Sequence, residues 1–113
     1  MDEFILYLQR QQKHHLSEAK KFAQDGRNDE ANLEKVKANI FSVFATVAKI
    51  PNQPTDFLAG KMDEIPTAWH ESLKKAIEHG DYEKELQERV KIAVMEEIKT
   101  AYASMTEGSE NDC

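Results

Sequence analysis

The chain contains few of the residues that cross-link a small fold or bend its backbone. Its 113 residues include one cysteine, four glycines and three prolines. The single thiol, Cys113, cannot close an internal disulfide or supply a thiolate zinc site, since both need several cysteines. Seven glycines and prolines in all are too few for an all-β fold, which needs a turn every ~8–12 residues. The composition therefore favours long helices.

Long apolar runs and an excess of positive charge are missing as well. The most apolar stretch, Ile40–Ile50, is far shorter than the roughly 20 residues of a membrane span and predicts a buried helix. Fifteen Lys and Arg against 21 Asp and Glu give a net charge of −6, which repels phosphate backbones. No basic stretch precedes the apolar Phe4–Leu8, as it would in a secretory leader. We expect a cytoplasmic protein that binds neither nucleic acid nor a membrane.

The apolar residues recur with helical spacing in four segments. Gly26 separates the first segment from the second, Gly80 separates the third from the fourth, and Pro51 and Pro54 lie between the two pairs. The segments span 2–24, 29–50, 66–79 with a short helical turn before it, and 81–105. The chain is therefore predicted to be all-α.

Short links determine how these helices are expected to pack. The links at Gly26 and Gly80 hold consecutive helices antiparallel, and Pro66 is expected to push Ile65 toward an extended conformation that interrupts the third helix. We predict a four-helix up-down-up-down bundle whose third helix is broken near Pro66. Residues 1–105 would form this single domain, and the acidic residues 106–113 are expected to be a disordered tail.

The two halves of the chain resemble each other when one is displaced by 54 residues. Seven of the 35 positions from Leu16 to Ile50 are then identical, among them Gly26 with Gly80 and Glu34 with Glu88. Either one helical hairpin was duplicated, or two hairpins converged on one pattern. The biased composition of helices favours convergence.

Several polar side chains fall on or beside the apolar helix faces. His15, Asn39 and Trp69 each lie roughly 10 residues from the Gly26 and Gly80 end, so at ~1.5 Å per residue they share one level. Glu97 lies roughly 10 Å further along, near Gln12. This set is either a pocket for a small ligand or a structural layer that fixes helix register. The candidate ligand-binding residues are Gln12, His15, Asn39, Trp69 and Glu97.

The patterns of known catalytic and metal sites are missing from the sequence. A dinuclear iron or manganese bundle needs Glu-x-x-His on facing helices, and no glutamate here has a histidine three residues later. Four scattered glycines form no phosphate-binding loop or nucleophile elbow. We identify no catalytic residue and expect neither a metal nor a cofactor. Whether the protein is an enzyme stays open, with the balance against it.

Apolar and basic patches remain on the expected surface. Ile40–Ile50 is apolar nearly all round, and Leu6 and Tyr7 fall outside the core face of the first helix. We predict a symmetric homodimer through this end of the bundle, with an interface formed by Leu6, Tyr7, Phe41, Ala45 and Ala48. Basic residues of the first helix form either a solvated face or a docking patch for an acidic partner, namely Arg10, Lys13, Lys20 and Lys21.

These features favour a non-enzymatic protein-interaction or regulatory module that acts through a helix face. The alternative is a small-ligand or metal-binding bundle that uses the polar layer in its core. The two hypotheses differ in where the function lies, on the surface or in the interior.

Overall fold

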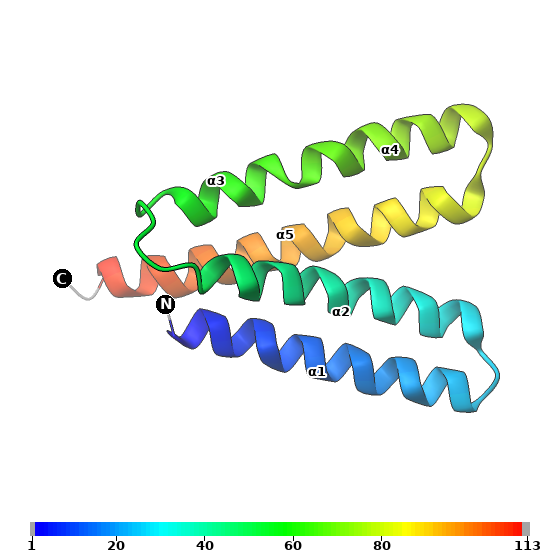
Figure 1. The fold of residues 1–113 in the computed structure, drawn as a ribbon, viewed down its shortest axis with the longest axis horizontal. Helices are drawn as coiled ribbons and strands as arrows, with labels where there is room; N and C mark the ends of the chain where they lie inside the picture. The colour runs from blue at the N-terminus through cyan, green and yellow to red at the C-terminus, as the bar shows by residue number, and fades with distance from the viewer. Residues whose placement is uncertain (1, 112–113) are drawn as a thin grey trace.

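The computed structural model describes the backbone of residues 2–111 and the side chains of residues 3–106. It contains five helical segments and no strand within that range, so the all-α class is confirmed. The segments, labelled in Figure 1, are α1 Asp2–Gln24, α2 Asn28–Ala48, α3 Phe57–Glu64, α4 Pro66–His79 and α5 Tyr82–Asn111. None of the described helices is both long enough and apolar enough to cross a membrane.

Segments α3 and α4 are one helix with a bend, as the sequence predicts. Pro66 is the first residue of α4. The extended conformation expected for Ile65 is wrong, because this residue keeps helical backbone angles, with φ −60° and ψ −43°. Because Pro66 has no N–H to donate and its ring crowds the preceding turn, the hydrogen-bond ladder is interrupted there. The predicted break near Pro66 is confirmed.

The fifth segment is longer than the spacing of apolar residues indicates. It runs to Asn111, beyond the expected end at residue 105. Residues 112–113 lie outside the described residues. The disorder predicted for residues 106–113 stays a prediction.

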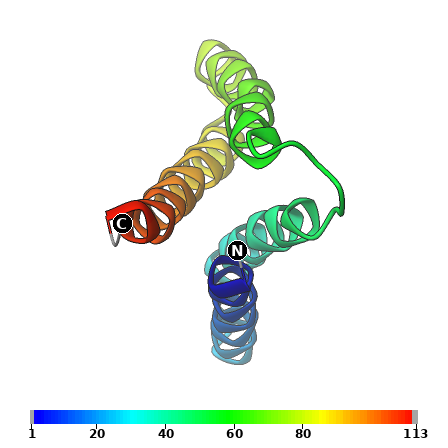
Figure 2. The ribbon, with the colours of Figure 1, turned by 90° about the vertical axis from the view of Figure 1, so that its left-hand side faces the viewer.

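The helices form two hairpins that meet through α2 and α5. Helix α1 packs along α2 and α4 packs along α5, while contacts between α2 and α5 join the pairs. Figure 1 shows the hairpins converging near the α2–α3 linker and diverging toward their two turns, and Figure 2 shows the end-on view. The radius of gyration is accordingly 15.7 Å, against about 13 Å for a compact domain of this size. The up-down-up-down order of a closed bundle stays a prediction.

Both interhelical turns have the same backbone conformation and hydrogen bonding. Gly26 and Gly80 have φ of 76° and 67°. This is a left-handed backbone conformation in which residues other than glycine are strained. The next residue then donates its N–H back into the helix, from Arg27 to the Phe22 carbonyl at 2.8 Å and from Asp81 to the Ala76 carbonyl at 2.9 Å. The two helices before these turns therefore end in the same way.

The displacement of 54 residues also relates the buried core of one hairpin to that of the other. It carries the start of α2, Asn28, onto the start of α5, Tyr82. Ten of the eleven residues in the main core cluster fall into pairs, namely Phe4/Leu58, Leu8/Met62, Ile40/Val94, Phe41/Met95 and Phe44/Ile98. We call positions related in this way equivalent positions. The likeness of the halves thus extends from residue identity to burial.

Candidate functional site

His15, the most distinctive of the predicted polar residues, is bound to a carboxylate on the neighbouring helix. Its Nδ1 lies 2.6 Å from Oε2 of Glu34, and both side chains are largely buried. The ring stacks on Phe41 with 5.5 Å between centroids and an interplanar angle of 11°. Lys37 reaches the other oxygen of Glu34 at 3.4 Å. The histidine is therefore engaged within the chain by a carboxylate and an aromatic ring.

Glu34 was not predicted from the sequence as the partner of His15. Glu34 precedes Phe41 by seven residues, which places both on one face of α2. That spacing was a usable signal, but the choice of partner depends on how far α1 is shifted along α2.

The structure does not bring the five predicted ligand-binding residues together. Asn39 and Glu97 are exposed, Gln12 is half-buried, and Trp69 packs against the core cluster. Of the five, only His15 takes part in a side-chain hydrogen bond among the described residues. Asn39 points to solvent because α2 turns Ala38, Ile40 and Phe41 inward and these occupy the other side of the helix. The expected layer is thus not assembled in space.

Glu88 on α5 is a buried polar residue that sequence reasoning missed. It is the equivalent of Glu34, yet it is only 1% exposed. Its Oε1 lies 3.0 Å from Lys91 Nζ and 3.6 Å from Lys84 Nζ, and both lysines belong to the same helix. Its Oε2 has no hydrogen-bond partner. The only sequence signal was its identity with Glu34.

The predicted dimer residues divide between core and surface. Phe41 and Ala45 are buried inside the chain's own core, and Tyr7 and Ala48 pack partly against it. Leu6 is 48% exposed. Phe41 and Ala45 therefore already contact other parts of the same chain, and homodimerisation stays a prediction.

The phenol of Tyr7 has a shifted pKa. Burial and the negative charge of Glu97 raise the pKa of the Tyr7 phenol above its ordinary value.

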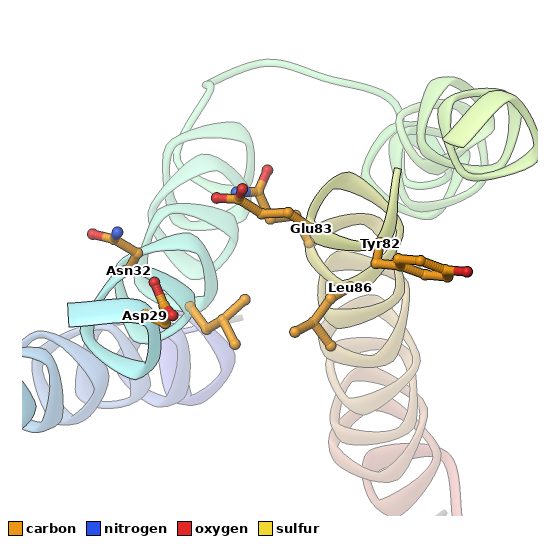
Figure 3. Close-up of a pocket in the computed structure, with 7 residues that line it drawn as sticks. Asp29, Asn32, Tyr82, Glu83 and Leu86 are labelled. Atoms are coloured by element: carbon orange, nitrogen blue, oxygen red, sulfur yellow. The ribbon is translucent and has the colours of Figure 1, made fainter. Parts of the chain in front are cut away.

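A hollow with a polar rim lies between the hairpins where they diverge, near the two turns. It has a volume of about 330 Å³ and is lined by Asp29, Asn32 and Leu33 of α2 and by Tyr82, Glu83, Leu86 and Gln87 of α5. We call it the inter-hairpin cleft. In Figure 3, Leu86 and Glu83 extend toward α2, while the Tyr82 ring points away from it. Its lining includes three equivalent pairs, Asp29/Glu83, Asn32/Leu86 and Leu33/Gln87.

The chemistry of the inter-hairpin cleft is apolar with negative charge. Leu86 is 50% exposed and lines the cleft together with Leu33. Asp29 and Glu83 lie in the first turns of their helices, where the helix dipole favours a negative charge. Neither carboxylate forms an ion pair with another residue in the described part of the chain. None of the residues that line the cleft places a nucleophile beside a base.

No group of three or more His, Cys, Asp or Glu side chains in the described residues is placed to hold a metal ion. Comparison with known protein families, curated proteins and solved structures finds no match.

Proposed function

We propose that the protein is a non-enzymatic interaction module that binds an amphipathic helix of a partner protein in the inter-hairpin cleft. The observation that carries the proposal is Leu86, which is half exposed between two helices that do not close over it. A helix laid between α2 and α5 would cover Leu33 and Leu86 with its own apolar side chains, which is the usual way in which a groove binds a helix.

The shape of the fold supports the same proposal. The core cluster holds the hairpins together at the linker end, while the turn end has no comparable cluster of buried residues. Two preformed helices therefore flank the cleft, so a partner helix would bind without first ordering the chain around it. The cytoplasmic location expected from the single cysteine belongs to this proposal too.

The small-ligand alternative has less support. His15, its central residue, is engaged by Glu34 and Phe41. The other four candidate ligand-binding residues do not converge on it.

A synthetic amphipathic helix of leucine and lysine tests the proposal. Added to the ¹⁵N-labelled protein, it should shift amide signals around Leu33 and Leu86 in a saturable way. Leu86→Ser should weaken binding by about 10-fold, since burying a leucine contributes roughly 1.5 kcal/mol or more. Ile77→Ser is the matched control, because Ile77 is also 50% exposed but lies on α4 outside the cleft.

Two results would contradict the proposal. One is the absence of saturable shifts at any peptide concentration. The other is equal weakening by Leu86→Ser and Ile77→Ser, which would place the binding elsewhere.

A further inference from the structure

The outer face of α1 has the chemistry that complements the inter-hairpin cleft. Lys13, Leu16, Ser17 and Lys20 are all exposed, and Leu16 is 48% exposed. At 100° per residue they occupy an arc of about 100° on one side of the helix. We call this surface the α1 basic face. It presents one large apolar side chain between two positive charges, whereas the cleft combines Leu33 and Leu86 with the carboxylates of Asp29 and Glu83.

The charges of these two surfaces are free to pair with a second molecule. In the described part of the chain, no ion pair involves Lys13 or Lys20, and the acid within this stretch, Glu18, pairs instead with Lys21 at 3.6 Å. Asp29 and Glu83 are likewise without an ion pair within the described residues. Opposite charges that stay unpaired within one molecule favour pairing between molecules.

The complementary pattern is specific to α1. The equivalent positions on α4 hold Thr67, His70, Glu71 and Lys74. The exposed leucine and one lysine are therefore replaced there, and an acid takes the place of Ser17. Among the two outer helices, α1 alone carries a basic face with an apolar centre.

We propose that the inter-hairpin cleft of one molecule binds the α1 basic face of a second copy of this chain. Leu16 enters between Leu33 and Leu86, while Lys13 and Lys20 pair with Asp29 and Glu83. The inference rests on the proposed function, because it takes the cleft to be a helix-binding surface and names its occupant. The two surfaces differ, so the contact is head-to-tail, and it either closes as a reciprocal dimer or continues into a chain. This head-to-tail contact differs from the symmetric homodimer through Leu6 that the sequence predicts.

Charge reversal on the full-length chain tests this contact. One variant carries Lys13→Glu with Lys20→Glu, and the other carries Asp29→Lys with Glu83→Lys. Sedimentation equilibrium of the unchanged protein should show association that rises with concentration and weakens between about 50 and 300 mM salt, as surface charge pairs are screened. Each variant alone should associate on the order of 100-fold more weakly, because like charges then face each other.

The decisive measurement is an equimolar mixture of the two variants. In this mixture, the α1 face made acidic by Lys13→Glu and Lys20→Glu can bind the cleft made basic by Asp29→Lys and Glu83→Lys. The unchanged cleft of the first variant can likewise bind the unchanged α1 basic face of the second, so the mixture should regain association. The matched control, Lys74→Glu with Lys75→Glu on α4, changes the net charge as much as the first variant and should associate normally. If the lysine substitutions at the helix N-termini reduce helical circular dichroism, Asp29→Asn with Glu83→Gln replaces them and should weaken association at low salt.

Several results would overturn the inference. They are a monomeric protein at every concentration and salt, variants that associate like the unchanged protein, and folded variants whose mixture does not recover. Association lost through Leu6→Ser instead would place the contact at the Leu6 end. If the leucine–lysine peptide still binds the cleft in any of these cases, the proposed function stands and only the second copy is wrong. If the peptide also fails to bind, both fall.

Discussion

The two hairpins share one plan but treat the same buried glutamate differently. In the first hairpin, Glu34 is bound across the helix pair by His15. In the second, Trp69 occupies the position equivalent to His15, and the ion pairs of Glu88 among the described residues are with lysines of its own helix. Glu88 is also the more deeply buried, and one of its oxygens has no partner.

This difference teaches that a repeated residue need not have a repeated energetic role. A buried carboxylate stabilises a fold only when its hydrogen bonds replace those it made with water. Glu34 meets that condition through a short contact to another helix, which also ties α1 to α2. Glu88 does not meet it, so its burial costs free energy that the surrounding core must offset. Substitutions at equivalent positions separate these roles.

The largest expected effect compares the core residues Phe41 and Met95. Both are fully buried at equivalent positions, but Phe41 also stacks on His15 and meets the Tyr7 ring edge-on at 6.0 Å. Phe41→Ala should lower the free energy of unfolding by ~3–5 kcal/mol, the usual cost of truncating a buried aromatic residue. Met95→Ala should cost about 1 kcal/mol less, because no aromatic pair is lost. Urea denaturation followed by circular dichroism measures both, and equal losses would show that the aromatic contacts contribute nothing.

Glu88→Met is expected to stabilise the protein. The unbranched apolar side chain fills a similar volume and removes the unpartnered oxygen, while Lys84 and Lys91 are partly exposed and can be hydrated. Replacing buried charge by well-packed apolar groups often raises stability by about 1–3 kcal/mol. Glu96→Met at an exposed position of α5 is the control for helix propensity and should change little. A clear loss of stability on thermal unfolding would mean that the lysines compensate Glu88 fully.

Glu34→Met is expected to destabilise the protein, in contrast to Glu88→Met. It removes the 2.6 Å contact to His15 and leaves a largely buried imidazole without its partner, at a cost of about 1–2 kcal/mol. A double-mutant cycle with His15→Leu should give a coupling of about 1 kcal/mol between the two residues. If the cycle shows no coupling, the contrast between the hairpins does not rest on this pair.

The helices were predictable from the sequence, whereas the way their faces meet was not. Glycines at 26 and 80 and the proline at 66 act locally, so their turns and bend follow from backbone chemistry alone. The rotation of α5 about its axis depends on three neighbours at once, α1, α2 and α4. It buries Glu88 and leaves Ala93 exposed, although the apolar spacing predicts that Ala93 faces the core. The inter-hairpin cleft depends on the angle between whole hairpins, which no short-range pattern encodes.

The smallest expected effect concerns Tyr7, whose equivalent in the second hairpin is Lys61. Because burial and Glu97 raise the pKa of the Tyr7 phenol above 10.0, the unfolded chain loses this proton more readily than the folded one. The resulting stability is present below pH 10 and is lost as the pH rises through the raised pKa. Tyr7→Phe should therefore flatten the alkaline fall in unfolding free energy, and Glu97→Gln should reduce it in part. If Tyr7→Phe leaves the fall in unfolding free energy at alkaline pH unchanged, other groups cause that fall. Tyr7 would then not distinguish the first hairpin from the second.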